Sequence, residues 1–124
     1  CMEADFTGLC FVNLVDFDSK YGHRNDADGY AKALSSFDSD LKKLDLLLGE
    51  GDAAIVTADH GCDPSDVSTD HTREYVPIVA FGRRLKSGVN LGVRESFCDI
   101  GATVAQLLGL GLKTGKSFAE EIVL

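Results

Sequence analysis

The sequence predicts an α/β protein with three layers, in which helices flank a mostly parallel sheet. Two short apolar runs, residues 9–15 and 53–58, have the composition of buried strands. Between them lies a stretch with helical periodicity, so the predicted order is strand, long helix, strand. Such a unit has a right-handed crossover and parallel strands that end at one edge of the sheet. Open α/β sheets bind their ligands at that edge.

The first of these strands runs directly into Asp16-Phe17-Asp18, which places carboxylates at its carboxyl end. The helix that follows is expected from Asp28 onward. Asp26 or Asp28 can cap its start, and Gly49 and Gly51 mark its end. Its apolar positions are spaced by three and four residues, as in an amphipathic helix: Tyr30, Leu34, Phe37, Leu41, Leu44 and Leu48.

Three further elements are predicted in the second half of the chain. Residues 76–81 form a third strand, with Pro77 near its start because proline cannot donate to a ladder. A helix opens within residues 96–99 and ends at Gly109 and Gly111. A last short helix starts at Ser117, where Ser117 and Glu120 have the spacing of a capping box.

Length and composition indicate one domain that covers residues 1–124. The chain is 44% hydrophobic, which is enough for a single core. Its formal net charge of −8 argues against nucleic-acid or anionic-membrane partners, which need clustered Lys and Arg. No apolar run is long enough to span a bilayer, so we expect a cytoplasmic protein. Its four cysteines lack the C-x-x-C spacing of zinc sites and are expected to be free thiols.

A candidate metal site is the main functional signal. All three histidines lie on the two loops that follow the predicted parallel strands, and aspartates accompany them. Mixed His and Asp ligands suit Zn²⁺ or Mn²⁺ better than Ca²⁺ or Mg²⁺. The five candidate ligands are Asp18 and His23 on the first loop and Asp59, His60 and His71 on the second.

Five ligands exceed what one catalytic ion needs, so two ions are predicted. Two ions about 3.5–4 Å apart are suited to in-line displacement at phosphorus, which makes phosphoryl transfer the predicted chemistry. A single ion held by Asp18, His23 and His71 is the alternative, because two histidines and a carboxylate also suit non-haem iron. In that case Asp59 and His60 have no role.

Three long motifs resemble a known family. Residues 13–26 read NLVDFDSKYGHRND, residues 57–65 read TADHGCDPS, and residues 69–74 read TDHTRE. These motifs are similar to the C-terminal part of the bacterial phosphopentomutases, members of the alkaline phosphatase superfamily. The similarity runs from about Phe6 to the end of the chain. The resemblance implies part of an alkaline-phosphatase-like core, without the cap domain and the N-terminal core segment.

The resemblance also implies a reaction and its cofactors. Enzymes of this family interconvert ribose or deoxyribose 1-phosphate and 5-phosphate, using two Mn²⁺ ions and a phosphorylated threonine. By matching position, Asp18, His23 and His71 resemble the ligands of one ion, and Asp59 with His60 resembles part of the other shell. The resemblance implies that the second ion also needs an aspartate from the first strand of the complete enzyme.

The resemblance implies that the threonine nucleophile lies outside this chain. Thr57, Thr69 and Thr72 sit inside the motifs, and none matches the nucleophile. A phosphorylated pentose and the missing N-terminal core segment are therefore the expected partners, and the isolated chain is expected to be inactive. Two alternatives stay open: a related metal-dependent phosphatase or phosphoglycerate mutase, and a non-catalytic metal-binding or interaction module.

Overall fold

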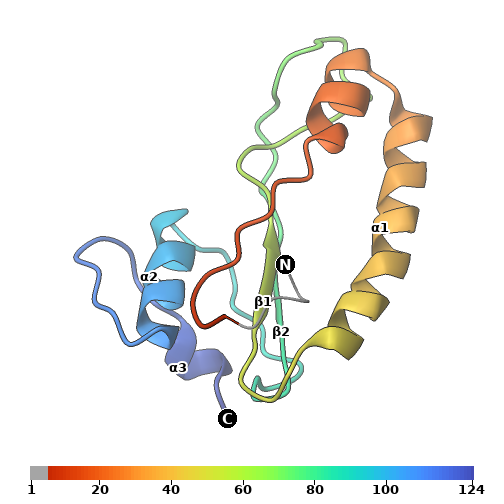
Figure 1. Cartoon of the computed structure of the whole chain (residues 1–124). Coiled ribbons are helices and arrows are strands. Elements are labelled where there is room, and N and C mark those ends of the chain that lie inside the picture. Colours follow the sequence, from red (N-terminus) through yellow and green to blue (C-terminus); the bar gives the residue numbers. More distant parts are fainter. Residues whose placement is uncertain (1–5) are drawn as a thin grey trace. The chain divides into compact units, whose positions relative to one another are not determined.

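The long helix α1 (Ala27–Leu47) forms where the periodicity predicts it. The computed structural model describes residues 6–124, and Figure 1 shows α1 as the longest helix. The Asp26 carboxylate accepts a hydrogen bond from the Gly29 N–H at 2.8 Å, so Asp26 is the N-cap. The helix ends before Gly49, which confirms both predicted boundaries.

The apolar face of α1 is only partly covered. None of its residues is buried, and Leu34 on that face is half exposed. Its main aromatic contact is Phe17, whose ring lies 5.5 Å from that of Tyr30 and 6.0 Å from that of Phe37. The face of α1 that the sequence assigns to a core therefore supports the turn that contains Phe17.

One sheet is present in residues 6–124, and it has two strands, β1 (Ala54–Thr57) and β2 (Ile78–Phe81). The chain runs along β1, makes a long loop and returns along β2, so the pair is antiparallel (Figure 1). An antiparallel bridge between Gly61 and Thr72 continues this pairing beyond the strand ends. Pro77 directly precedes β2, as predicted.

The predicted strand at residues 9–15 is absent, and the expected βαβ unit was wrong. The segment has no strand structure, and its side chains are exposed; Phe11, for example, is 84% exposed. Strand propensity is realised only when neighbouring strands offer a ladder and a packing surface, and neither β1 nor β2 pairs with this segment. The structure is therefore α/β with a small antiparallel sheet and helices, and the three-layer, mostly parallel sheet is not confirmed.

The described chain divides into two compact units. One contains Phe11–Leu48 and Ala54–Ala80, and the other contains residues 6–10, Gly49–Ala53 and Phe81–Leu124. The first unit holds α1, β1 and every residue of the predicted metal site. A single domain over residues 1–124 stays a prediction.

The second unit is built around α2 (Cys98–Leu107) and α3 (Ala119–Ile122), close to the predicted positions. Its core contains Phe118, which is fully buried. The predicted capping box is not formed, because Phe118 is the N-cap of α3 and the Ser117 hydroxyl accepts from the Ala119 N–H at 3.1 Å. The remaining buried apolar residues of this unit are Ala102, Ala105, Ala119 and Ile122.

Two polar side chains tie the segment before α3 to α2. The buried Thr103 hydroxyl donates to the Asp99 carbonyl at 2.7 Å and accepts from the Phe118 N–H at 3.0 Å. The Asp99 carboxylate accepts from the Lys116 N–H at 2.8 Å and from Arg94 Nε at 3.1 Å. These hydrogen bonds satisfy polar groups that the core would otherwise leave unpaired.

No helix within residues 6–124 is long and apolar enough to cross a membrane. Cys62 and Cys98 have free thiols, as predicted, whereas Cys1 lies outside the described residues.

Candidate metal centre

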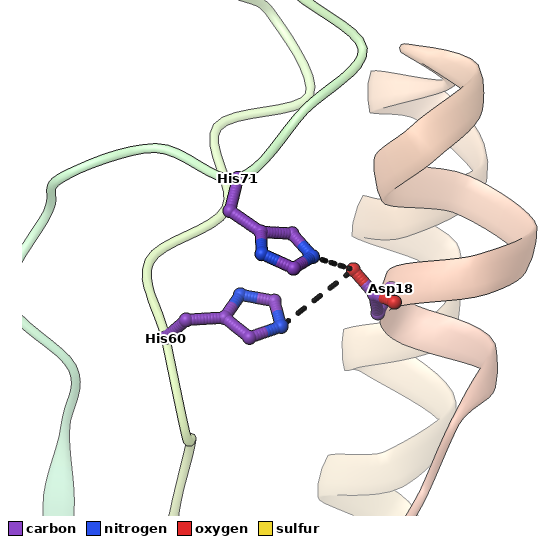
Figure 2. Close-up of side chains that lie close together, drawn as sticks. All are labelled: Asp18, His60 and His71. Atoms are coloured by element: carbon purple, nitrogen blue, oxygen red, sulfur yellow. Dashed lines mark ion pairs between the residues drawn. The ribbon is translucent and has the colours of Figure 1, made fainter.

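Asp18 and His23 are placed by two consecutive helical turns rather than by the end of a strand. The first is a π-helical turn, η1 (Phe17–Tyr21), and the second is a 3₁₀ turn, η2 (Gly22–Arg24). Phe17 packs against α1 and anchors η1 there, and the carboxylate of Asp18, the next residue, faces His60 and His71 (Figure 2). Gly22 is buried, and a Cβ there would lie 2.5 Å from the Cys62 sulfur. Glycine therefore lets the first loop approach the second one closely.

His60 and His71 come from the two ends of the long loop between β1 and β2. Their rings are stacked, with centroids 3.7 Å apart and an interplanar angle of 17°. The antiparallel bridge between Gly61 and Thr72 explains this arrangement, because it joins the residues that directly follow each histidine. The His23 ring lies 5.1 Å from the His71 ring, so all three histidines belong to one cluster.

Backbone carbonyls orient two of these rings. His23 Nδ1 lies 2.5 Å from the Thr69 carbonyl oxygen, and His60 Nδ1 lies 3.0 Å from the Gly61 carbonyl oxygen. Because a carbonyl can only accept, each Nδ1 is a donor, and in a neutral ring this leaves Nε2 as the acceptor. A neutral imidazole with Nδ1–H bonded to a carbonyl is the form in which histidine binds metals through Nε2.

The three histidines converge on one oxygen of Asp18. Nε2 of His23 and Nε2 of His71 each lie 3.4 Å from Asp18 Oδ1, and Nε2 of His60 lies 3.7 Å from it. Figure 2 shows the rings of His60 and His71 pointing toward this oxygen. Asp18 Oδ1 is nevertheless buried without a hydrogen-bond partner among the described residues. A buried carboxylate oxygen without such a bond requires another source of stabilisation.

The spacing of these atoms fits a cation. Asp18, His60 and His71 each offer one ligand atom, and these atoms lie within 4.8 Å of one another. Ligands about 2.1 Å from a tetrahedral ion are themselves about 3.4 Å apart. The distances from Asp18 Oδ1 to the three imidazole nitrogens, 3.4 to 3.7 Å, are close to this value. The donor set thus suits Zn²⁺ or Mn²⁺ on geometric and chemical grounds.

Asp59 lies at the rim of this cluster. Its side chain is 90% exposed, and its Oδ1 is 3.7 Å from Nε2 of His60. The structure therefore places three of the five predicted ligands, the histidines, around a carboxylate oxygen of the fourth, Asp18. The fifth, Asp59, lies beside them and faces solvent. The division of these residues between two ions stays a prediction.

Cys62 was not among the predicted site residues, although it lies beside the cluster. Burial raises the pKa of the Cys62 thiol, and the neighbouring Asp18 carboxylate raises it further. The thiol is therefore protonated at neutral pH and contributes no negative charge to the centre. Its position directly after the histidine and glycine of the second motif was the only signal in the sequence.

Thr72 and Glu74 were also missed. Thr72 Oγ1 accepts a hydrogen bond from the Asp63 N–H at 2.7 Å and donates to a Glu74 carboxylate oxygen. Hydrogen bonds of this kind depend on the path of the loop, which residue patterns do not reveal. Thr72 lies next to a predicted ligand in the sequence, and that adjacency was its only signal.

Comparison with known proteins decides the family. The model of the metalloenzyme superfamily matches residues 1–112. This chain belongs to the metalloenzyme superfamily. Membership implies a metal cofactor, and the cluster of Asp18, His60 and His71 is a candidate site for it.

Relatives within this superfamily are named phosphopentomutase. The one from Carboxydothermus hydrogenoformans is 57% identical over 118 residues, which are 95% of this chain and 30% of the relative. That from Lachnoclostridium phytofermentans is 53% identical over 120 residues, 96% of this chain and 31% of the relative. That from Caldanaerobacter subterraneus is 52% identical over 124 residues, 99% of this chain and 32% of the relative. The chain thus spans about a third of the length of these relatives.

Proposed function

We propose that this chain carries the metal-binding part of a phosphopentomutase. In this proposal the complete enzyme interconverts ribose or deoxyribose 1-phosphate and 5-phosphate through a phosphothreonine, with two Mn²⁺ ions. The identity of 52 to 57% to three phosphopentomutases supports the reaction. The convergence of His23, His60 and His71 on Asp18 Oδ1 is the structural observation that carries the metal assignment.

In the proposed reaction the residues of this chain hold and orient the metal. Asp18 supplies a carboxylate oxygen, and the three histidines supply ring nitrogens; backbone carbonyls orient the rings of His23 and His60. Bound divalent ions reduce the charge penalty on a transferring phosphoryl group and align its oxygens. The net negative charge of the chain, −8, adds to its demand for cations.

The exposed position of Asp59 suits a second ion that is shared with another part of the enzyme. Its carboxylate faces solvent next to His60, and within the described residues no other carboxylate joins it in a metal-ligand cluster. We propose that the N-terminal core segment of the full enzyme supplies the missing aspartate and the threonine nucleophile, and that a cap domain supplies pentose recognition. On this proposal the isolated chain is inactive.

Residues 9–15 are the proposed contact with that N-terminal core segment. Leu9, Phe11 and Val12 are 62, 84 and 63% exposed, although their composition favours a buried strand. Pairing with a strand of the additional segment would satisfy the backbone of this region and cover its side chains. This explains why a segment with strand propensity has no strand structure in the present chain.

Calorimetric titration with Mn²⁺ tests the metal assignment. Removing a ligand with Asp18→Ala or His71→Ala is expected to weaken binding by at least about 100-fold, more than loss of an outer-shell partner. Asp66→Ala is the matched control, because Asp66 is an acidic residue of the same loop whose carboxylate, within residues 6–124, accepts from the adjacent Val67 N–H alone. Equal Mn²⁺ binding by all three variants would refute the site.

Reconstitution tests the reaction. The chain is combined with the N-terminal segment of a related phosphopentomutase, and conversion of ribose 5-phosphate to ribose 1-phosphate is followed. Restored conversion, absent with either piece alone, supports the proposal. Metal binding without any phosphoryl transfer would instead identify a non-catalytic metal-binding module. Hydrolysis of the phosphate ester or mutation of phosphoglycerate would identify a related phosphatase or phosphoglycerate mutase.

A further inference from the structure

Thr72 joins the two ends of the loop that carries His71, through both its backbone and its hydroxyl. The backbone of Thr72 pairs with Gly61, and its N–H donates to the Gly61 carbonyl at 3.1 Å. Its hydroxyl accepts from the Asp63 N–H at 2.7 Å. Thr72 is therefore hydrogen-bonded to Gly61 and to Asp63, the residues on either side of Cys62. Gly61 directly follows His60. These contacts join the two ends of a loop whose residues 65–71 are exposed.

The direction of the Thr72 hydroxyl is set by Glu74. A hydroxyl has one proton, and here it donates to the Glu74 carboxylate. The oxygen of the hydroxyl is thereby left to accept from the Asp63 N–H. The side chain of Asp63 accepts from the Ser65 N–H at 2.9 Å, so the Asp63 peptide is held from a second direction. The result is a chain of hydrogen bonds from Glu74 through Thr72 to Asp63.

The backbone packing at this point allows little adjustment. A Cβ on Gly61 would lie 2.7 Å from the Thr72 carbonyl oxygen and 2.7 Å from the Glu74 nitrogen. Two backbones in such close contact transmit a displacement of one to the other. Because His60 precedes Gly61 and His71 precedes Thr72, the separation of the two imidazoles follows the geometry of this contact.

We propose that Thr72 is a positioning residue that sets the separation between His60 and His71. Its hydroxyl holds the loop ends in the register that stacks the two rings 3.7 Å apart, with both Nε2 atoms near Asp18 Oδ1. This inference rests on the proposed metal site for its functional meaning, but its geometry is testable without metal. The effect resembles that of outer-shell partners that orient metal ligands.

Thr72→Val tests the proposal, because valine keeps the size of threonine and the backbone bridge to Gly61 but removes the hydroxyl. In the metal-free chain we expect the Asp63 amide to exchange with solvent about five times faster, as for one lost hydrogen bond. We also expect the nuclear Overhauser effect between the rings of His60 and His71 to weaken. Thr72→Ser is expected to restore both signals. Unchanged signals in Thr72→Val would overturn the proposal.

A matched control and a second variant complete the experiment. Thr57→Val makes the same chemical change in β1, where the hydroxyl has a long 3.4 Å contact with the Ala58 carbonyl, and should change neither signal. If Thr72→Val does not fold, Glu74→Ala tests the same chain of hydrogen bonds without altering Thr72. It is expected to shift both signals in the same direction by a smaller amount, and wild-type signals in Glu74→Ala would then overturn the proposal.

Titration with Mn²⁺ separates this inference from the proposed function. If both are correct, Thr72→Val binds Mn²⁺ about 10- to 100-fold more weakly than wild type, and Thr72→Ser is close to wild type. If the wild type does not bind Mn²⁺, the metal assignment fails, while the two metal-free signals still decide the role of Thr72. Equal Mn²⁺ affinity of wild type and Thr72→Val overturns the positioning role alone.

Discussion

Thr103 provides a test of the energetics of the unit that contains α2 and α3. Its side chain is fully buried and makes two hydrogen bonds, to the Asp99 carbonyl and from the Phe118 N–H. Thr103→Val keeps the volume of the side chain, so no cavity forms, but the Phe118 N–H loses its partner. An unpaired buried N–H costs about 1–3 kcal/mol, and the Asp99 carbonyl can still accept its bond within the helix. We therefore expect a loss of about 2 kcal/mol in the free energy of unfolding.

The measurement is urea unfolding followed by circular dichroism. For an m value of about 2 kcal/mol/M, a loss of about 2 kcal/mol lowers the midpoint by about 1 M. Thr103→Ser keeps the hydroxyl and loses one buried methyl group, which costs about 1 kcal/mol. The hydroxyl argument thus predicts that Thr103→Val is less stable than Thr103→Ser. The opposite order, or a valine variant as stable as wild type, would refute this reasoning.

Three other predictions concern stability. Asp26→Ala removes the N-cap of α1 and should destabilise the chain by about 1 kcal/mol in urea unfolding. The Lys116 N–H holds the pKa of the Asp99 carboxyl below its ordinary value. The ionised Asp99 carboxylate therefore stabilises the folded state fully above the unfolded pKa of about 3.9, and this stabilisation is lost as pH falls through the folded pKa. Asp99→Asn should accordingly lower the urea midpoint at neutral pH, and the midpoint of this variant should fall less on acidification than that of the wild type. An equal fall in both proteins would contradict this. Phe118→Ala should cost about 3–5 kcal/mol because the ring is fully buried, whereas Phe11→Ala, at an 84% exposed position, should cost less than about 0.5 kcal/mol; equal losses would contradict the burial argument.

Helices were predicted well because their signals are local. The start of α1 depends on one carboxylate and one N–H three residues apart, and its extent depends on apolar spacing within the helix. α2 ends before Gly109, whose φ of 72° is a conformation that glycine adopts without strain. These features need no information about distant parts of the chain. The predicted N-cap of α3 was Ser117 and the observed one is Phe118, so the error is one residue, which is the usual precision of helix boundaries.

The sheet was not predicted correctly because strands depend on their neighbours. Residues 9–15 and β1 have similar apolar compositions, yet only β1 has a partner, and that partner is the antiparallel β2. A periodicity argument identifies a segment that can be a strand, but it does not provide the strand beside it. The parallel arrangement was inferred from the order strand, helix, strand, so it failed when the first strand was absent.

Asp18 and His23 lie close to the histidines of the second loop, as predicted, although the predicted parallel sheet is not present. The sequence argument brought the two loops together through parallel strands that end at one edge, whereas the structure does so through η1, which Phe17 anchors to α1. The predicted and the observed backbone arrangements thus bring the same two loops together. The spacing of Asp18 from Phe17 is a single residue, so packing of the ring determines where the carboxylate lies. The cluster of Asp18 with the three histidines therefore depends on α1 and on the loop between β1 and β2, and it forms here without the predicted parallel sheet.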